Sequence, residues 1–258
     1  MDKQIISPDG TPIAYGRSGA GPAVVLVSGA MSTGGTLAPL AKRLTDRFTV
    51  VVYDRRGRGA SGDTAPYAVA REVEDLAALI EAVGGRAALY GVSSGGALAL
   101  EAAASGLPVP QVAVYEPPFA QPGGEEERAE YTERLTEALA RGRRGDAVEL
   151  FLRLTGLAEQ MIQGARQSPM WADMEAIAPS LAYDDAVLCG GALPRERIAS
   201  IGVPVLAVAG GASPEWLRTS TAQVAQAAPR GAFRTLADQT HMVDPDVLAP
   251  ILAEFFAG

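Results

Sequence analysis

Residues 87–103 read AALYGVSSGGALALEAA, an apolar run followed by a serine-containing turn and an alanine-rich segment. The apolar run predicts a buried strand, and the alanine-rich segment predicts a helix. Between them, Ser93 lies in a G-x-S-x-G pattern, which presents a serine on a sharp strand-to-helix turn. The bare pattern arises by chance about once in six sequences of this composition, so its weight comes from the strand and helix around it. This setting indicates that Ser93, rather than the adjacent Ser94, is a nucleophile.

Charge and composition narrow the class of function. The chain has 258 residues, and 22 Lys and Arg against 30 Asp and Glu give a net charge of −8, which argues against nucleic acid or an anionic membrane as partner. A single cysteine, Cys189, excludes an internal disulfide, and with one histidine we expect no metal site. No glycine-rich nucleotide motif occurs, so we expect no cofactor. Without an apolar leader or membrane-length run, we expect a soluble, cytoplasmic protein that acts on a small molecule.

Strand and helix signals alternate along the first and last parts of the chain. This alternation predicts an α/β fold with a mostly parallel, doubly wound sheet and helices on both faces. Strands are expected at 4–6, 13–15, 23–27, 48–53, 87–90, 112–115, 203–208 and 233–236, and helices at 36–45, 68–83 and 245–256, besides the helix after Ser93.

Residues 117–200 interrupt this alternation, because they contain helical patterns and no convincing strand. The helical stretches are expected at 125–141, 146–157, 159–167 and 170–178. Since ordinary connections are much shorter, we interpret 117–200 as a helical cap inserted into a core formed by 1–116 and 201–258. A lid over the site is one reading, and extra helices packed on one face are the alternative.

His241, the sole histidine, lies in a loop between the last predicted strand and a helix whose start is marked by Asp244 and Pro245. The segment DRRGRGAS at 54–61 and the segment LVSGA at 26–30 are two further motifs. With these motifs the chain resembles the α/β-hydrolase superfamily over nearly its whole length, with Ser28 in place of the usual histidine. The resemblance implies that His241 is the catalytic base. It also implies an oxyanion hole formed by the backbone N–H groups of Ala30 and Ser94.

The acid of the expected triad is displaced from its usual position. The segment GGASP at 210–214 resembles the family's G-x-x-D-P, but Ser213 replaces the aspartate and cannot stabilise an imidazolium. Some members of the family place the acid one strand earlier, where this chain has Glu116. We therefore expect Glu116 to be the acid, with Asp238 as the alternative and a dyad assisted by water as a third possibility. Asp244 is expected to cap the last helix.

A serine nucleophile points to esters, thioesters, lactones or activated amides. The expected activity is therefore hydrolysis of a small, largely apolar ester, thioester or lactone through an acyl-enzyme. The alternatives are a biosynthetic acyl transferase, cyclase or thioesterase that uses the same serine, and a ligand-binding protein without turnover. The acyl substrate and the oligomeric state stay open. Residues expected to line an apolar substrate pocket are Met31, Phe119, Trp171 and Met242.

Overall fold

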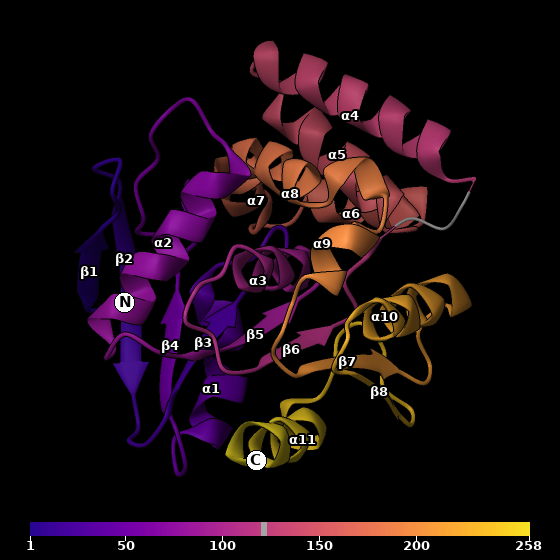
Figure 1. Cartoon of the computed structure of the whole chain (residues 1–258). Coiled ribbons are helices and arrows are strands. Elements are labelled where there is room, and N and C mark those ends of the chain that lie inside the picture. The colour runs from indigo at the N-terminus through magenta and orange to yellow at the C-terminus, as the bar shows by residue number, and fades with distance from the viewer. Residues whose placement is uncertain (120–122) are drawn as a thin grey trace.

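The computed structural model describes residues 1–119 and 123–258, and of Glu125 it describes the backbone alone. Eight strands form one sheet in the order β1-β2-β4-β3-β5-β6-β7-β8 (Figure 1). Strands β3 to β8 run parallel, whereas β1 and β2 form an antiparallel hairpin that pairs with β4 at one edge. The strands are β1 Lys3–Ile6, β2 Pro12–Ser18, β3 Ala23–Val27, β4 Thr49–Tyr53, β5 Ala88–Val92, β6 Val112–Tyr115, β7 Val205–Gly210 and β8 Gly231–Leu236.

Helices cover both faces of the sheet, which explains why the central strands are almost entirely apolar. Alternate side chains of β3 illustrate the two layers: Val25 packs in the cluster under α2, α3 and α10, and Val24 and Leu26 pack in the cluster under α1 and α11. These helices are α1 Ala38–Leu44, α2 Val69–Ala82, α3 Ser94–Ala104, α10 Glu215–Ala227 and α11 Pro245–Ala257. The α/β fold with a mostly parallel sheet is therefore confirmed. In the part of the chain that the structure describes, no helix has the length and apolar character needed to cross a membrane.

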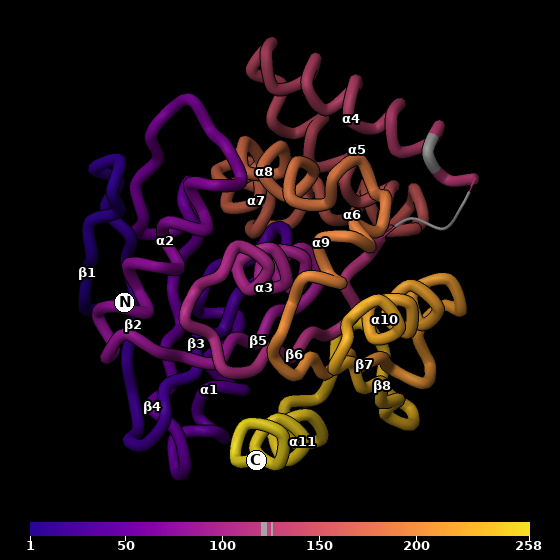
Figure 2. Tube along the Cα trace, viewed as in Figure 1, coloured from indigo at the N-terminus to yellow at the C-terminus, as the bar shows by residue number. Residues whose placement is uncertain are grey.

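The chain leaves the sheet after β6 and returns to it at β7. Helices α4 to α8 lie above the carboxyl ends of the strands, whereas α9 packs beside α3 and α10 (Figures 1 and 2). This helical layer has its own apolar cluster, which includes Leu135, Val148 and Leu181. The predicted insertion, 117–200, contains this layer, although its residues 120–122 lie outside the described residues. The elements are α4 Glu125–Ala140, α5 Arg144–Leu154, α6 Glu159–Arg166, α7 Trp171–Ile177, η2 Ala178–Ser180, α8 Leu181–Val187, η3 Cys189–Gly191 and α9 Arg195–Ala199.

Candidate active site

Ser93 occupies the turn between β5 and α3 in a backbone conformation that is rare for a side-chain-bearing residue, with φ of 56° and ψ of −129°. The turn is closely packed, because a Cβ atom at Gly91 would overlap the carbonyl oxygen of Gly95, and one at Gly95 would overlap the carbonyl oxygens of Val27 and Ser28. Glycine is thus required on both sides of the serine. The strained turn is typical of a nucleophile that must project from the end of a strand.

Glu116 follows β6 directly, and its side chain is completely buried. Its Oε2 atom lies 2.8 Å from Nδ1 of His241, and its Oε1 atom accepts a hydrogen bond of 2.8 Å from the backbone N–H of Gly210. Both carboxylate oxygens are therefore occupied. The Gly210 contact fixes the orientation of the carboxylate toward the imidazole, which remains partly accessible, with 39% of its side chain exposed.

A tyrosine holds the loop that carries His241. The hydroxyl of Tyr115 donates a hydrogen bond of 2.6 Å to the carbonyl of Thr240, the residue before the histidine. Burial, and next the neighbouring Glu116 carboxylate, raise the pKa of Tyr115 above its ordinary value. The hydroxyl is thus protonated at neutral pH and serves as the donor to Thr240.

The other carboxyl groups considered for the acid lie elsewhere. Asp238 is exposed and has no contact with His241 among the described residues. Asp244 accepts a hydrogen bond of 2.8 Å from the backbone N–H of Asp246, so the prediction that it caps α11 is confirmed. Ser213, at the usual position of the acid, is buried, and its hydroxyl has no partner within the described residues.

Two backbone amides flank Ser93 without protein acceptors. The N–H groups of Ala30, after β3, and Ser94, the first residue of α3, donate to no atom of the described chain. Amides left free beside a nucleophile can bind the oxyanion of a tetrahedral intermediate. The placement of Gly29 agrees with this role, since a Cβ atom there would come within 2.9 Å of Cβ of Ser93.

The segment 54–61 forms a turn below these amides and buries three guanidinium groups. Asp54 receives hydrogen bonds of 2.9 Å from the N–H groups of Gly34 and Ala60, which ties the turn to the loop after β3. Arg55, Arg56 and Arg58 are each no more than 2% exposed. Because a buried guanidinium needs a carboxylate partner, each of the three must be paired.

Each buried arginine has at least one acidic partner. Arg55 pairs with Glu72 of α2 at 2.6 Å, and Arg56 pairs with Asp75 of the same helix at 2.8 Å. Arg55 and Arg58 also share the carboxylate of Asp184, in helix α8, at 2.7 and 2.6 Å. The four charged residues of this motif, Asp54 and the three arginines, therefore lie in the protein interior. They form no basic surface.

The four residues predicted to line a substrate pocket are dispersed. Met31 is half-buried, follows Ala30 and packs against the apolar cluster of α4 to α8. Trp171 is buried within that cluster, with the guanidinium of Arg166 5.9 Å from its ring centroid. Met242, beside the histidine, is 83% exposed. Met31 therefore lies in the loop after β3 and contacts the helical layer.

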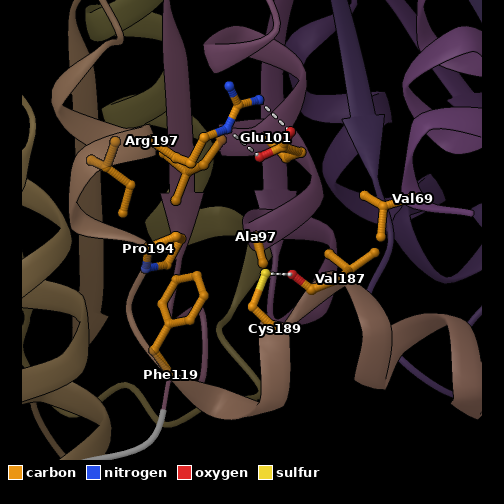
Figure 3. A pocket seen from close by; sticks show the side chains of 10 residues that line it. Val69, Ala97, Glu101, Phe119, Val187, Cys189, Pro194 and Arg197 are labelled. Atoms are coloured by element: carbon orange, nitrogen blue, oxygen red, sulfur yellow. Dashed lines mark hydrogen bonds and ion pairs between the residues drawn. The ribbon is translucent and has the colours of Figure 1, made fainter.

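Phe119, the fourth residue, lines a separate cavity of about 260 Å³ on the outer side of α3 (Figure 3). The cavity is bounded by Cys189, by Ala97 and by the ion pair between Glu101 and Arg197. Its lining residues do not include Ser93 or His241. Phe119 therefore packs beside α3, in a cavity that Ser93 does not line.

Helix α8 contains the polar residue that the sequence reasoning missed. Neither α8 nor α9 was expected, and in α8 the buried face carries two aspartates, which interrupt the apolar pattern of an inward-facing helix. Asp184 and its neighbour Asp185 are both buried. The sequence did contain one signal for Asp184. Three arginines stand close together at 55–58, and if they are buried they require acidic partners from elsewhere in the chain.

The fold, the pairing of Glu116 with His241 and the strained serine turn are together typical of a class of hydrolytic enzymes. A model of the alpha/beta hydrolase family matches residues 24–251. The chain belongs to the alpha/beta hydrolase family, and it is an enzyme of that class.

Relatives and solved structures agree with this assignment. An alpha/beta hydrolase from Sphaerobacter thermophilus is 50% identical, with 98% of this chain and 100% of that chain covered and a TM-score of 0.88. An enol-lactonase from Burkholderia xenovorans shares the fold at 21% identity, with 99% and 100% covered and a TM-score of 0.73.

The curated relatives match over a shorter segment. A polyketide synthase from Burkholderia thailandensis is 39% identical over 98 residues, which are 37% of this chain and 5% of the synthase. A pimeloyl-[acyl-carrier protein] methyl ester esterase from Stenotrophomonas maltophilia is 40% identical over 89 residues, 34% of this chain and 33% of the esterase. The matched segments thus span a third or less of these relatives.

Proposed function

We propose that this enzyme hydrolyses a small, largely apolar carboxylic ester, thioester or lactone through an acyl-enzyme on Ser93. The contact of 2.8 Å between Glu116 Oε2 and His241 Nδ1 carries the proposal. It supplies a base with an oriented ring, and Ser93 occupies the strained turn between β5 and α3. The esterase and the enol-lactonase among the similar proteins act on the class of bond proposed.

The orientation of His241 determines which nitrogen can act as base. A carboxylate only accepts hydrogen bonds, so Nδ1 carries the proton directed at Glu116 and Nε2 is left with a free electron pair. In the proposed first step, Nε2 takes the proton of Ser93 as Oγ bonds to the acyl carbon. The electron pair of the carbonyl bond moves to its oxygen, which the amides of Ala30 and Ser94 stabilise.

The second half of the cycle reverses these roles. The protonated His241 gives its proton to the leaving alcohol, thiol or ring oxygen as the carbon–oxygen or carbon–sulfur bond breaks. A water molecule, deprotonated by the same nitrogen, then attacks the acyl carbon. The bond from that carbon to Oγ breaks, the acid leaves, and Nε2 returns the proton to Oγ of Ser93. Glu116 stabilises the imidazolium in both halves.

Labelling and hydrolysis test the proposal directly. A fluorophosphonate should modify the wild type at Ser93, as shown by mass spectrometry of the peptide, and p-nitrophenyl acetate and butyrate should be hydrolysed. Ser93→Ala and His241→Ala should each lower kcat by about 10³-fold or more. The exposed Ser105→Ala, at the other end of α3, is the matched control and should behave as wild type. Hydrolysis that persists in Ser93→Ala across a broad ester panel contradicts the proposal.

The partial match to a polyketide synthase favours a second candidate, an acyl transferase, cyclase or thioesterase that uses the same serine. In a transferase or cyclase, a hydroxyl, amine or thiol of a substrate replaces water as the acceptor of the acyl group. In a thioesterase, the acyl group arrives as a thioester. Product analysis by mass spectrometry separates the two, with acyl thioesters and added alcohols as probes. Free acid plus alcohol from every competent substrate contradicts a transferase or cyclase.

A further inference from the structure

One buried carboxylate of the helical layer lies directly behind the serine turn. Asp184, in α8, accepts hydrogen bonds through Oδ1 from the Ser94 hydroxyl and from NH1 of Arg55, both at 2.7 Å. Its Oδ2 accepts from NH2 of Arg58 at 2.6 Å. The site is therefore a built cluster of one carboxylate, two guanidiniums and one hydroxyl. All four groups are almost fully buried, with side-chain exposures of Asp184, Arg55 and Arg58 of 5%, 1% and 0%.

Arg58 extends from this carboxylate to the loop that contains the first free amide. Its NH1 donates to the carbonyl of Gly29 at 2.6 Å and to that of Ser32 at 3.2 Å. The Gly29 carbonyl and the Ala30 N–H belong to the same peptide unit, in which they point in opposite directions because the peptide is planar and trans. A guanidinium held on the carbonyl side thus fixes the direction of the N–H, and its charge polarises the peptide so that the N–H is a stronger donor.

The second free amide is tied to the same carboxylate. Ser94 provides the other proposed oxyanion donor through its N–H, while its hydroxyl donates to Asp184. Arg55 adds a weaker contact of 3.3 Å to the carbonyl of Ser28 in the loop after β3. Both halves of the proposed oxyanion hole therefore have Asp184 behind them, one through Arg58 and the other through the Ser94 side chain.

We propose that Asp184 is a positioning residue for the oxyanion hole. Turnover therefore depends on the position of α8 relative to the sheet. The proposal rests on the proposed function, since it concerns the amides of Ala30 and Ser94. The carboxylate holds Arg58 against the Gly29 peptide and holds Ser94 at the start of α3. The two N–H groups then keep the spacing that a tetrahedral oxyanion requires.

The charge state of Asp184 suits this role. Burial alone would raise its pKa, but the guanidiniums of Arg58 and Arg55 and the Ser94 hydroxyl outweigh that effect and lower its pKa below the ordinary value. At neutral pH the residue is ionised, so it neutralises part of the charge of two buried arginines and can only accept hydrogen bonds.

Asp185, the next residue of α8, provides a matched comparison. It is also buried, and it accepts a hydrogen bond of 2.7 Å from Thr132 and pairs with Arg128 at 2.9 Å, both in α4. Its partners belong to the helical layer, and it has no contact with the serine turn or the loop after β3 among the described residues. A change at Asp185 therefore perturbs a buried acidic residue of the same helix without reaching the oxyanion hole.

The experiment compares Asp184→Asn with Asp185→Asn on p-nitrophenyl acetate. Asp184→Asn should lower kcat by about 10- to 100-fold with KM within about threefold of wild type, because donors are misaligned rather than removed. Asp185→Asn should leave kcat within about twofold. An alkyl trifluoromethyl ketone, which adds the serine oxygen and forms an oxyanion, should lose affinity in Asp184→Asn in proportion to the loss of kcat/KM. Thermal denaturation of both variants separates these effects from a loss of folded protein.

A milder variant covers the case in which Asp184→Asn does not fold. Ser94→Ala removes one hydroxyl contact and keeps the backbone N–H, and it should lower kcat by about three- to tenfold with little change in Tm. Equal kcat in Asp184→Asn and Asp185→Asn, or unchanged kcat in Ser94→Ala when Asp184→Asn is unfolded, overturns the inference. Ser93→Ala is run alongside, and activity that survives in that variant refutes the proposed function instead.

Discussion

Glu116 and His241 are 125 positions apart in the chain, and their side chains meet with 2.8 Å between Oε2 and Nδ1. Three neighbouring strands contribute to this contact. Glu116 follows β6, His241 lies in the loop after β8, and Gly210, at the end of β7 between them, donates its N–H to the other carboxylate oxygen. The contact thus depends on the order of the parallel strands, which brings their carboxyl ends to one edge of the sheet.

Glu116→Gln should lower kcat by about 10²- to 10⁴-fold, with KM little changed. The N–H of Gly210 requires an acceptor, so the glutamine oxygen will face Gly210 and its NH₂ group will face His241. Nδ1 must then accept, which leaves the proton on Nε2, where it cannot take the proton of Ser93. Steady-state kinetics on p-nitrophenyl esters measure the effect, and a loss below tenfold rejects Glu116 as the acid.

The control for that variant is Asp238→Asn. Asp238 is exposed and lies three residues before the histidine, so it shares the loop without sharing the contact. Its kcat should stay within about twofold of wild type. A larger loss in Asp238→Asn than in Glu116→Gln would transfer the acid role to Asp238.

Gly29→Ala should impair turnover more than stability. The new methyl group would lie 2.9 Å from Cβ of Ser93 and 3.1 Å from the carbonyl oxygen of Val92, which is closer than carbon atoms pack. The serine turn or the loop after β3 must shift, and we expect kcat to fall by about tenfold or more. Gly35→Ala is the matched control, in the 3-10 helix η1 (Gly34–Leu37) that follows this loop, since its methyl group would meet Thr33 at an ordinary 3.6 Å. Equal values of kcat in Gly29→Ala and Gly35→Ala would show that the close approach of Gly29 to Ser93 does not affect turnover.

Ser213 and Ser220 are both buried, but their hydroxyls differ in bonding. Ser213 has no partner among the described residues, whereas Ser220 donates to the carbonyl of Pro117 at 3.0 Å. Ser213→Ala should therefore change the free energy of unfolding by less than about 0.5 kcal/mol, and Ser220→Ala should reduce it by about 1–2 kcal/mol. Denaturant titration measures both values. A drop in kcat for Ser213→Ala would mean that this hydroxyl takes part in orienting His241.

Asp184 should make stability dependent on acid. Its pKa is lowered in the folded protein from the ordinary 3.8, so its contribution is complete above that value and is lost as the pH falls through the folded-state pKa. Asp184→Asn should cost about 3 kcal/mol or more at pH 7, because two guanidiniums stay buried without their shared carboxylate. The difference from wild type should narrow below about pH 4.

Denaturant titrations from pH 3 to pH 7 measure that difference. Asp246→Asn serves as the control, since the pKa of Asp246 is also lowered, by Arg43, but its carboxylate is exposed and its pairing is screened by solvent. A gap between wild type and Asp184→Asn that widens in acid would contradict the direction of the pKa shift.

The fold could be predicted from the sequence where buried strands and amphipathic helices have strong local patterns. The run at 23–27 and the segment at 88–92 are apolar because helices cover them on both sides. The short helix α8 could not be predicted in this way. Its seven residues are held by contacts with distant parts of the chain, and such contacts leave no periodic pattern.

The candidate site shows the same division. Ser93 and His241 were predicted from local motifs and from their places after expected strands, and Glu116 was predicted from the resemblance to hydrolases that place the acid one strand earlier. Asp184 has no motif, because its role depends on Arg55 and Arg58, which precede it by more than 120 residues. The side chain of Met242 could not be placed either, since adjacency to His241 in sequence does not decide which way a loop residue faces.

The shared carboxylate of Asp184 limits how freely the helical layer could be exchanged. A layer transplanted from another hydrolase would leave Arg55 and Arg58 of the sheet domain as buried cations without that counter-ion, whatever its shape. Exchange of these helices as a unit therefore has to preserve a carboxylate at this position. A functional graft must bring an acidic residue to the place that Asp184 occupies beside the turn at 54–61. The presence of that residue is a simple criterion for choosing helical layers that suit this sheet domain.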